Sequence, residues 1–210
     1  MGREEVGART KKVSVLICYV TYLATAASIV AVFKLSPSDD WYLNGFIADM
    51  VGASVIFFFS FVWGNTSLID PSWYLFPVSQ GIFWVCAADE MSVRGWIAFA
   101  LLMLWAARFI YQWPWEGLTE GLTMEDWRFV DISNRIGGKG VRYWIFSLFG
   151  FHLIPTQMTF FALSPVSKVW LNGKDSVPFG TFDAVAISVA FGAIVLAFVA
   201  DKQMCDFRQS

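Results

Sequence analysis

The sequence has little charge and almost no histidine for its length. Of its 210 residues, 15 are Lys or Arg, 17 are Asp or Glu, and one is His. Charged residues make up 15% of the chain, well below the roughly 25% of a soluble domain. A formal net charge of -2 without a basic stripe argues against a nucleic-acid partner. One His and three Cys residues without paired spacing argue against a metal site and a disulfide framework.

Long apolar runs dominate the sequence instead, because 57% of the residues are hydrophobic and 18% are aromatic. A transmembrane helix needs about 20 mostly apolar residues. Six stretches approach that length, and we expect all six to cross a membrane. They are residues 13–33, 46–63, 73–88, 95–113, 143–163 and 179–200. The third is short and contains Pro77, so a tilted, broken or re-entrant segment is the alternative there.

These runs predict an all-α, polytopic transmembrane bundle of about six spans. We expect one membrane domain over residues 13–210, after an N-terminal tail of residues 1–12. Lys and Arg resist translocation in short loops. With both termini in the cytoplasm, most of the Lys and Arg residues outside the spans lie on the cytoplasmic side. The protein is therefore predicted to be multi-pass, in the endoplasmic reticulum membrane if the organism is eukaryotic.

The longest segment outside the predicted spans is the cytoplasmic loop of residues 114–142. Its mixed charges predict an ordered cap with a short helix around residues 124–135, which Thr123 could cap. The loop either covers helix ends only or contributes to a binding site.

Several ionisable residues fall inside or at the edge of apolar runs. They are Asp49, Arg108, His152, Asp183 and Asp201. An Asp or Arg at a helix centre costs about 2.5 to 3.5 kcal/mol, so such residues usually face a partner or a ligand. The simpler alternatives are that Arg108 snorkels to the interface, that Asp49 and Asp183 mark helix starts, and that His152 bonds a carbonyl freed by the following proline.

Five polar motifs, taken together, resemble a known family. The pattern N-x-S-x-x-D-x-x-W runs from Asn65 to Trp73 and is similar to a signature of the steroid 5-alpha-reductase-like membrane proteins, in the subgroup of unknown function. Four further motifs follow in the order that the family uses. They are Arg108 near a helix end, Glu125-Asp126-Trp127-Arg128-Phe129, His152-Leu153-Ile154-Pro155-Thr156 and Ala200-Asp201-x-Gln203-x-x-x-Phe207.

The resemblance implies an enzyme that holds NADPH from the cytoplasmic side and reduces a carbon-carbon double bond conjugated to a carbonyl, in a sterol or another lipid. Asp201 and Arg208 match an Asp and an Arg that contact the cofactor in the steroid reductases. A guanidinium suits a phosphate because it is a fixed fork of donors. Arg108 and Gln203 resemble other parts of the same pocket.

Reduction of this kind needs a group that stabilises the developing enolate oxygen. Asp70, Tyr74 and His152 are the candidate catalytic residues, because each is ionisable or hydroxylic and lies near the proposed cavity.

Two departures from the family pattern favour an alternative. Ala197 stands where the family has Asn or Glu, and family members continue past the position of Ser210 through a Ser-Arg-His-Pro-Asn-Tyr-type segment. We therefore expect weak or no NADPH binding by this chain. The alternative function is a non-catalytic membrane protein of the same fold that binds lipid or serves as a partner subunit. Oligomeric state and the identity of the lipid stay open.

Overall fold

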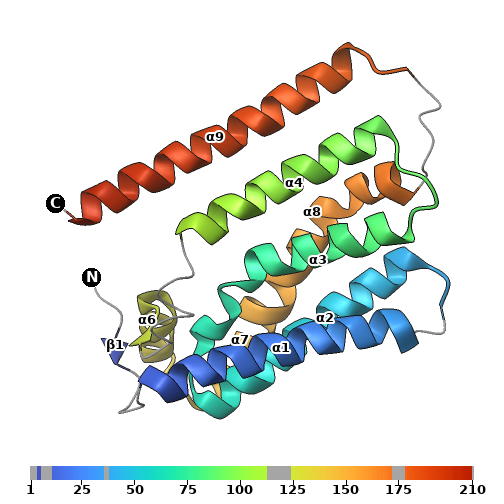
Figure 1. The fold of residues 1–210 in the computed structure, drawn as a ribbon. Helices are drawn as coiled ribbons and strands as arrows, with labels where there is room; N and C mark the ends of the chain where they lie inside the picture. Colours follow the sequence, from blue (N-terminus) through green and yellow to red (C-terminus); the bar gives the residue numbers. More distant parts are fainter. Residues whose placement is uncertain (1–3, 6–10, 36–37, 113–123, 172–177, 210) are drawn as a thin grey trace.

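A computed structural model describes residues 4–5, 11–35, 38–112, 124–171 and 178–209. Over these residues the protein is almost entirely helical (Figure 1). The helices are α1 (Lys11–Leu35), α2 (Trp41–Trp63), α3 (Ser72–Ala87), α4 (Val93–Gln112), α6 (Trp127–Arg135), α7 (Val141–Ser147), α8 (Ile154–Leu171), α9 (Thr181–Gln209), the 3-10 helix η1 (Thr66–Ile69) and the π-helix η2 (Leu148–Leu153).

Four helical segments of the described chain are long and apolar enough to cross a membrane. They are Lys12–Leu35, Trp41–Trp63, Val141–Leu171 and Thr181–Met204. The predicted class, an α-helical membrane protein, is confirmed at this level. α3 has 16 residues and is shorter than a usual span. The count of six spans and the orientation of the termini therefore stay predictions.

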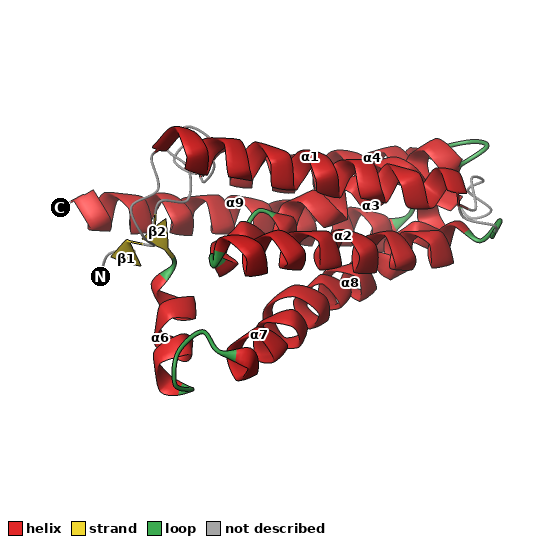
Figure 2. Ribbon diagram, turned by 90° about the horizontal axis from the view of Figure 1, so that it is seen from below, coloured by secondary structure: helices red, strands yellow, loops and turns green. Residues whose placement is uncertain are grey.

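The helices pack in neighbouring pairs along one bundle (Figure 1). α1 lies against α2, α3 packs against α8, and α4 lies beside α9. β1 (Glu4–Glu5), α6 and the end of α9 lie at the same end of the bundle, and α6 lies across the direction of the long helices (Figure 2). That end holds the polar cluster described below.

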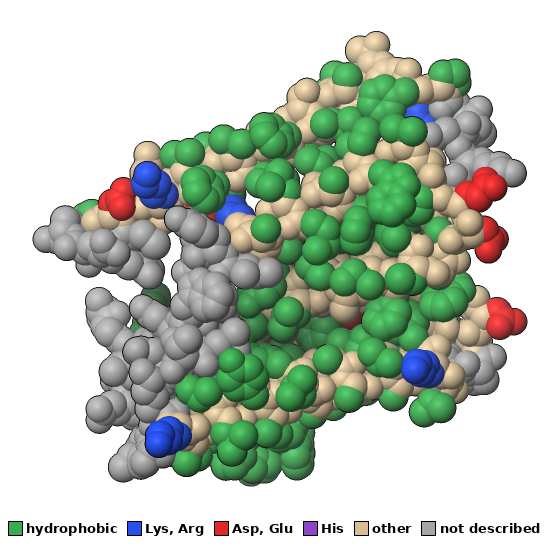
Figure 3. All heavy atoms as spheres, viewed as in Figure 1, with side chains coloured by type: hydrophobic (Ala, Val, Ile, Leu, Met, Phe, Trp, Pro, Cys, Tyr) green, Lys and Arg blue, Asp and Glu red, His purple; other side chains and the backbone are tan. Residues whose placement is uncertain are grey.

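Apolar side chains cover the flank of the bundle that Figure 3 shows, while Lys, Arg, Asp and Glu gather toward its two ends. Many large hydrophobic side chains are exposed on these helices, including Leu16, Phe58, Phe161 and Leu196. In water such a surface would be a liability, whereas in a lipid core it is the favourable one.

Capping residues explain why two helices differ from their predicted bounds. α2 begins at Trp41 rather than near residue 46, because the Asp40 carboxylate accepts hydrogen bonds from the N–H groups of Tyr42 and Leu43. α6 begins at Trp127 rather than near residue 124, because the Asp126 carboxylate caps it. Thr123, the predicted cap, lies outside the described residues.

The remaining bounds also differ: α3 is shifted by one residue at the same length, and several other helices extend beyond the apolar runs. α1 begins at Lys11 inside the predicted tail, α8 continues to Leu171 through Pro165, and α9 continues to Gln209 through polar residues. β1 pairs antiparallel with β2 (Met124–Glu125), a two-residue exception to the all-α prediction. The tail of residues 1–12 and the loop of residues 114–142 are thus joined rather than separate.

The predicted span over residues 143–163 is one continuous helical run, from α7 through η2 to α8, with a π-turn in its middle. Pro155 has no N–H to donate, so the α-helical hydrogen-bond ladder is interrupted there. The Ile154 N–H donates to the Phe149 carbonyl, which is the wider π spacing. This turn points the His152 side chain into the bundle, where it is completely buried.

Candidate functional site

Two parts of the molecule gather the residues that the sequence motifs contain. The first is a group at one end of the bundle that we call the polar cluster. It consists of Asn65, Thr66, Ser67, Asp70, Glu125, Asp126, Arg128, Lys139 and Tyr143. The second is the contact between α4 and α9, which we call the α4–α9 seam.

Glu125 is the centre of the polar cluster and is only 1% exposed. Its Oε1 accepts a hydrogen bond of 2.7 Å from the Thr66 N–H, and its Oε2 forms an ion pair with Lys139. The Lys139 ammonium also donates to the Gly64 carbonyl at 2.6 Å. Gly64 ends α2 in the left-handed conformation, with φ of 66°, which glycine adopts without strain. A buried carboxylate with a cation and a backbone donor is satisfied on both oxygens.

The signature loop is fastened by further hydrogen bonds. The hydroxyls of Thr66 and Tyr143 lie 2.6 Å apart, and the Asp126 N–H donates to Ser67 Oγ at 2.8 Å. Asn65 Oδ1 accepts from the Ser67 N–H at 3.0 Å, which is an Asx-type turn. The Asn and Ser of the signature thus shape the loop and hold it against the segment that begins at Glu125.

Arg128 bridges two acidic groups on the outer side of the polar cluster. Its Nε lies 2.8 Å from Asp126 Oδ1, and its Nη2 lies 3.6 Å from Asp70 Oδ1. The hydrogen bond with Asp126 raises the pKa of the Arg128 guanidinium above its ordinary value. Asp70, a candidate catalytic residue, therefore lies beside a permanent cation.

The other two catalytic candidates occupy different surroundings. Tyr74 is buried in α3, and its ring stacks on Phe109 of α4 with centroids 5.7 Å apart. Tyr22 interacts electrostatically with both Asp70 and Tyr74, so these two candidates share one region. His152 is in η2 and contacts another set of residues, described next.

Both ring nitrogens of His152 have hydrogen-bond partners. Nδ1 lies 2.8 Å from the Ser147 carbonyl, and Nε2 lies 3.2 Å from Ser60 Oγ. A carbonyl can only accept, so Nδ1 carries the proton and Nε2 accepts from the Ser60 hydroxyl. His152 thus joins α2 to the π-turn. It bonds a backbone carbonyl as the structural alternative proposed, but that carbonyl belongs to Ser147 and is not the one that Pro155 leaves without a donor.

The α4–α9 seam brings together two of the four predicted cofactor residues. Arg108 of α4 forms an ion pair with Asp201 of α9, and their side chains are 9% and 38% exposed. Arg108 Nε is buried and has no acceptor among the described residues. Gln203 lies exposed on α9, and the side chain of Arg208 lies outside the described part of the chain.

A second ion pair closes the other end of the seam. Arg94 Nε and Nη2 lie 2.5 Å and 2.8 Å from the two carboxylate oxygens of Asp183, and Nη2 also donates to the Pro178 carbonyl at 3.1 Å. Asp183 in turn accepts from the Gly180 N–H at 2.8 Å. The two aspartates of α9 that fall inside or at the edge of its apolar run are therefore both paired with an arginine of α4.

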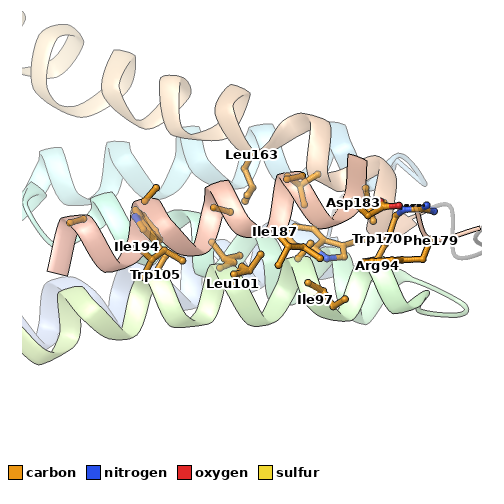
Figure 4. Close-up of a pocket in the computed structure, with 18 residues that line it drawn as sticks. Arg94, Ile97, Leu101, Trp105, Leu163, Trp170, Phe179, Asp183, Ile187 and Ile194 are labelled. Atoms are coloured by element: carbon orange, nitrogen blue, oxygen red, sulfur yellow. Dashed lines mark hydrogen bonds and ion pairs between the residues drawn. The ribbon is translucent and has the colours of Figure 1, made fainter. Parts of the chain in front are cut away.

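Between the ion pairs lies an apolar chamber of about 550 Å³ formed by α4, α8 and α9 (Figure 4). Ile97, Leu101 and Trp105 of α4 lie along one wall, with Ile187 and Ile194 of α9 opposite. A groove of this size with few polar groups suits the hydrocarbon part of a lipid.

Three residues that the structure places in these regions were not predicted as site residues. Lys139 and Tyr143 complete the polar cluster, and Arg94 completes the seam. A buried acid such as Glu125 requires a cation, but no spacing rule identifies which Lys or Arg supplies it.

The fold and these sites define a helical membrane protein with a buried polar cluster at one end of the bundle. The chain belongs to the family described as "Protein of unknown function (DUF1295)", whose model matches residues 56–210. The matched range includes the whole polar cluster and the seam.

An uncharacterized protein of Schizosaccharomyces pombe is a curated relative. It is 27% identical over 188 residues, which cover 84% of this chain and 53% of the relative. The chain thus spans about half the length of the curated relative it matches. No solved structure matches the chain.

Proposed function

We propose that the protein is a membrane-embedded reductase that uses NADPH to reduce a carbon-carbon double bond conjugated to a carbonyl in a lipid or sterol. The proposal extends the resemblance to the steroid 5-alpha-reductase-like proteins. The observation that carries it is the Arg108–Asp201 pair, which lies about one helical turn beyond Trp105 and Ala197, the residues that line the nearest end of the apolar chamber.

The donors of Arg108 fit a phosphate group. One nitrogen pairs with Asp201, while Nε is buried and has no acceptor among the described residues. A phosphate oxygen would supply that acceptor, and guanidinium groups bind phosphates through such paired donors. Asp201 would orient Arg108, and Gln203 and Arg208 follow on the same helix. Bound NADPH would supply the hydride.

The proposed membrane arrangement is six spans with both termini in the cytoplasm, in the endoplasmic reticulum if the cell is eukaryotic. The position of β1, α6 and the end of α9 at one end of the bundle supports it (Figure 1). The polar cluster lies at that end and would form the rim nearest the cofactor. Lipid substrate would enter the chamber from the bilayer.

The test is an NADPH titration of the protein in lipid nanodiscs, followed by cofactor fluorescence. The Arg108→Ala variant is expected to lose at least roughly tenfold in affinity, because one charge-assisted phosphate contact contributes more than the 1.4 kcal/mol that a factor of ten requires. The matched control is Arg135→Ala, which removes an exposed arginine of α6 outside the seam and should bind as the wild type does.

Equal affinities for the wild type and Arg108→Ala would contradict the assignment of the phosphate site. The expectation of weak or no binding by this chain stays a prediction that the same titration tests. Oxidation of NADPH with an enone-containing sterol or lipid would then identify the substrate class.

One observation favours the second candidate, a non-catalytic lipid-binding protein. Asp201 is already paired with Arg108, so these two groups satisfy each other in part without a cofactor. In that case the wild type would retain lipid through purification without binding NADPH. A Leu101→Trp variant, which fills the chamber, would release that lipid.

A further inference from the structure

Asp49 is a buried acidic residue to which the proposed function assigns no role. It lies roughly two turns inside α2 rather than at its start, and it is 1% exposed. The sequence raised the possibility that Asp49 marks a helix start, but Asp40 has that role. Its position is within a segment long and apolar enough to cross a membrane.

The two carboxyl oxygens of Asp49 have no hydrogen-bond donor among the described residues. No described Lys, Arg or His forms an ion pair with it, although Asp183, Asp201 and Glu125 each have one. The surrounding core is apolar: a Cβ at Gly52, about one turn along α2, would meet Ile29 of α1 and Phe76 of α3.

The polar side chain beside the carboxyl is Gln80 of α3. Its amide nitrogen donates to the Gly45 carbonyl at 2.7 Å, and this contact fixes which end of the amide is the nitrogen. Gln80 Oε1 likewise has no donor in the described structure. Three buried acceptor atoms therefore occur at this interface without a hydrogen bond. The second N–H of the Gln80 amide is the donor beside the carboxyl and can serve only one of them, so acceptors outnumber donors between α2 and α3.

We infer that Asp49 is a proton-binding site: the carboxyl holds a proton in the folded protein at neutral pH. A proton removes the charge, whose burial without a partner costs several kcal/mol, and it converts one acceptor atom into the missing donor. The ligand of this site is thus a single proton held between α2 and α3. Asp49 differs in this respect from every ion-paired carboxylate in the described part of the chain.

The close packing at the site limits other occupants. A Cβ added at Gly45 would lie 2.5 Å from Gln80 Oε1, so α2 and the Gln80 side chain are already in contact there. A hydrated cation needs several oxygen ligands and more space, whereas a proton needs neither.

The experiment is infrared spectroscopy of the whole protein in lipid nanodiscs at neutral pH. We expect one C=O absorption in the region of protonated carboxylic acids, shifted on slow exchange into deuterium oxide. The band should be absent in Asp49→Asn, which has nearly the same shape as the neutral acid. The matched control is Asp183→Asn, which removes an ion-paired aspartate from another helix and should leave the band intact.

A second measurement does not depend on any variant folding. Incorporation of carbon-13-labelled aspartate into the wild type should move the same band to lower frequency. The inference is overturned if the wild type shows no protonated-acid band at neutral pH, if the band persists in a folded Asp49→Asn variant, or if it does not respond to aspartate labelling. It is also overturned if the band appears only when choline replaces sodium in the buffer, because a cation would then be the ligand.

Discussion

The polar cluster and the α4–α9 seam use charged residues in opposite ways. In the cluster, buried Glu125 is surrounded by a cation, a backbone amide and a hydroxyl network from loops far apart in the sequence. In the seam, charged side chains pair only near the two ends, and the middle is an apolar chamber. The cluster therefore fixes one geometry, whereas the seam leaves space between two helices.

Burial strengthens this contrast. In the most apolar stretch of α9, no residue is buried within the protein. In the corresponding stretch of α2, 39% of the residues are buried. α9 is held mainly by its contact with α4, while the loop of the cluster is covered from several directions. We expect substitutions in the cluster to reduce the free energy of unfolding, and substitutions in the seam to change the position of α9.

The largest effect is expected for Glu125→Ala. The substitution leaves the Thr66 N–H and the Lys139 ammonium without their shared acceptor, and the expected loss is about 3 kcal/mol, the lower end for a broken buried pair because Lys139 is partly exposed. Thermal unfolding in detergent measures it.

Two controls accompany this prediction. Glu125→Gln keeps an acceptor for Thr66 and should lose less, and Asp39→Ala removes an exposed acid at the other end of the bundle and should lose little. If Glu125→Ala and Asp39→Ala melt alike, the polar cluster does not hold the fold as described.

A smaller effect is expected for the hydroxyl pair of Thr66 and Tyr143. Tyr143→Phe and Thr66→Val each remove one partner of a buried 2.6 Å hydrogen bond. The double variant should lose less free energy of unfolding than the sum of the two single losses. The difference should be about 1 kcal/mol, the usual net contribution of such a bond. The free energies of unfolding of the four proteins give the coupling. Additive losses would mean that the two hydroxyls act independently.

Much of the fold could be predicted from the sequence. Apolar length and low charge identify the membrane class and locate all the long helices, because both properties are local. Helix ends were less predictable, since caps such as Asp40 and Asp126 are short polar residues among other polar residues. α9 also continues well past its apolar run.

The candidate site was predictable only in part, because motifs name residues without their partners. The signature loop and the Glu125 segment could be recognised separately, yet their contact through Thr66 and Ser67 required the fold. Asp49 carried no motif. What distinguishes it is the lack of a partner, and that is a property of three-dimensional packing.

The smallest effect on stability, and the clearest effect on structure, is expected for Arg94→Gln. The bidentate pair with Asp183 is partly exposed, and such pairs contribute little to unfolding free energy. The pair nevertheless fixes one end of α9 to α4 across the chamber (Figure 4). Spin labels at Met103 of α4 and Val195 of α9, both exposed, should report a broader distance distribution in Arg94→Gln than in the wild type.

The same labels separate the two regions. Glu125→Gln should leave the distance distribution unchanged, because the polar cluster does not touch the chamber. Arg108→Gln, at the other end of the seam, should broaden it as Arg94→Gln does. A distribution that stays narrow in both arginine variants would show that apolar contacts alone hold α9. The two ion pairs would then not determine the position of α9. The polar cluster and the α4–α9 seam would differ only in how deeply their charged side chains are buried.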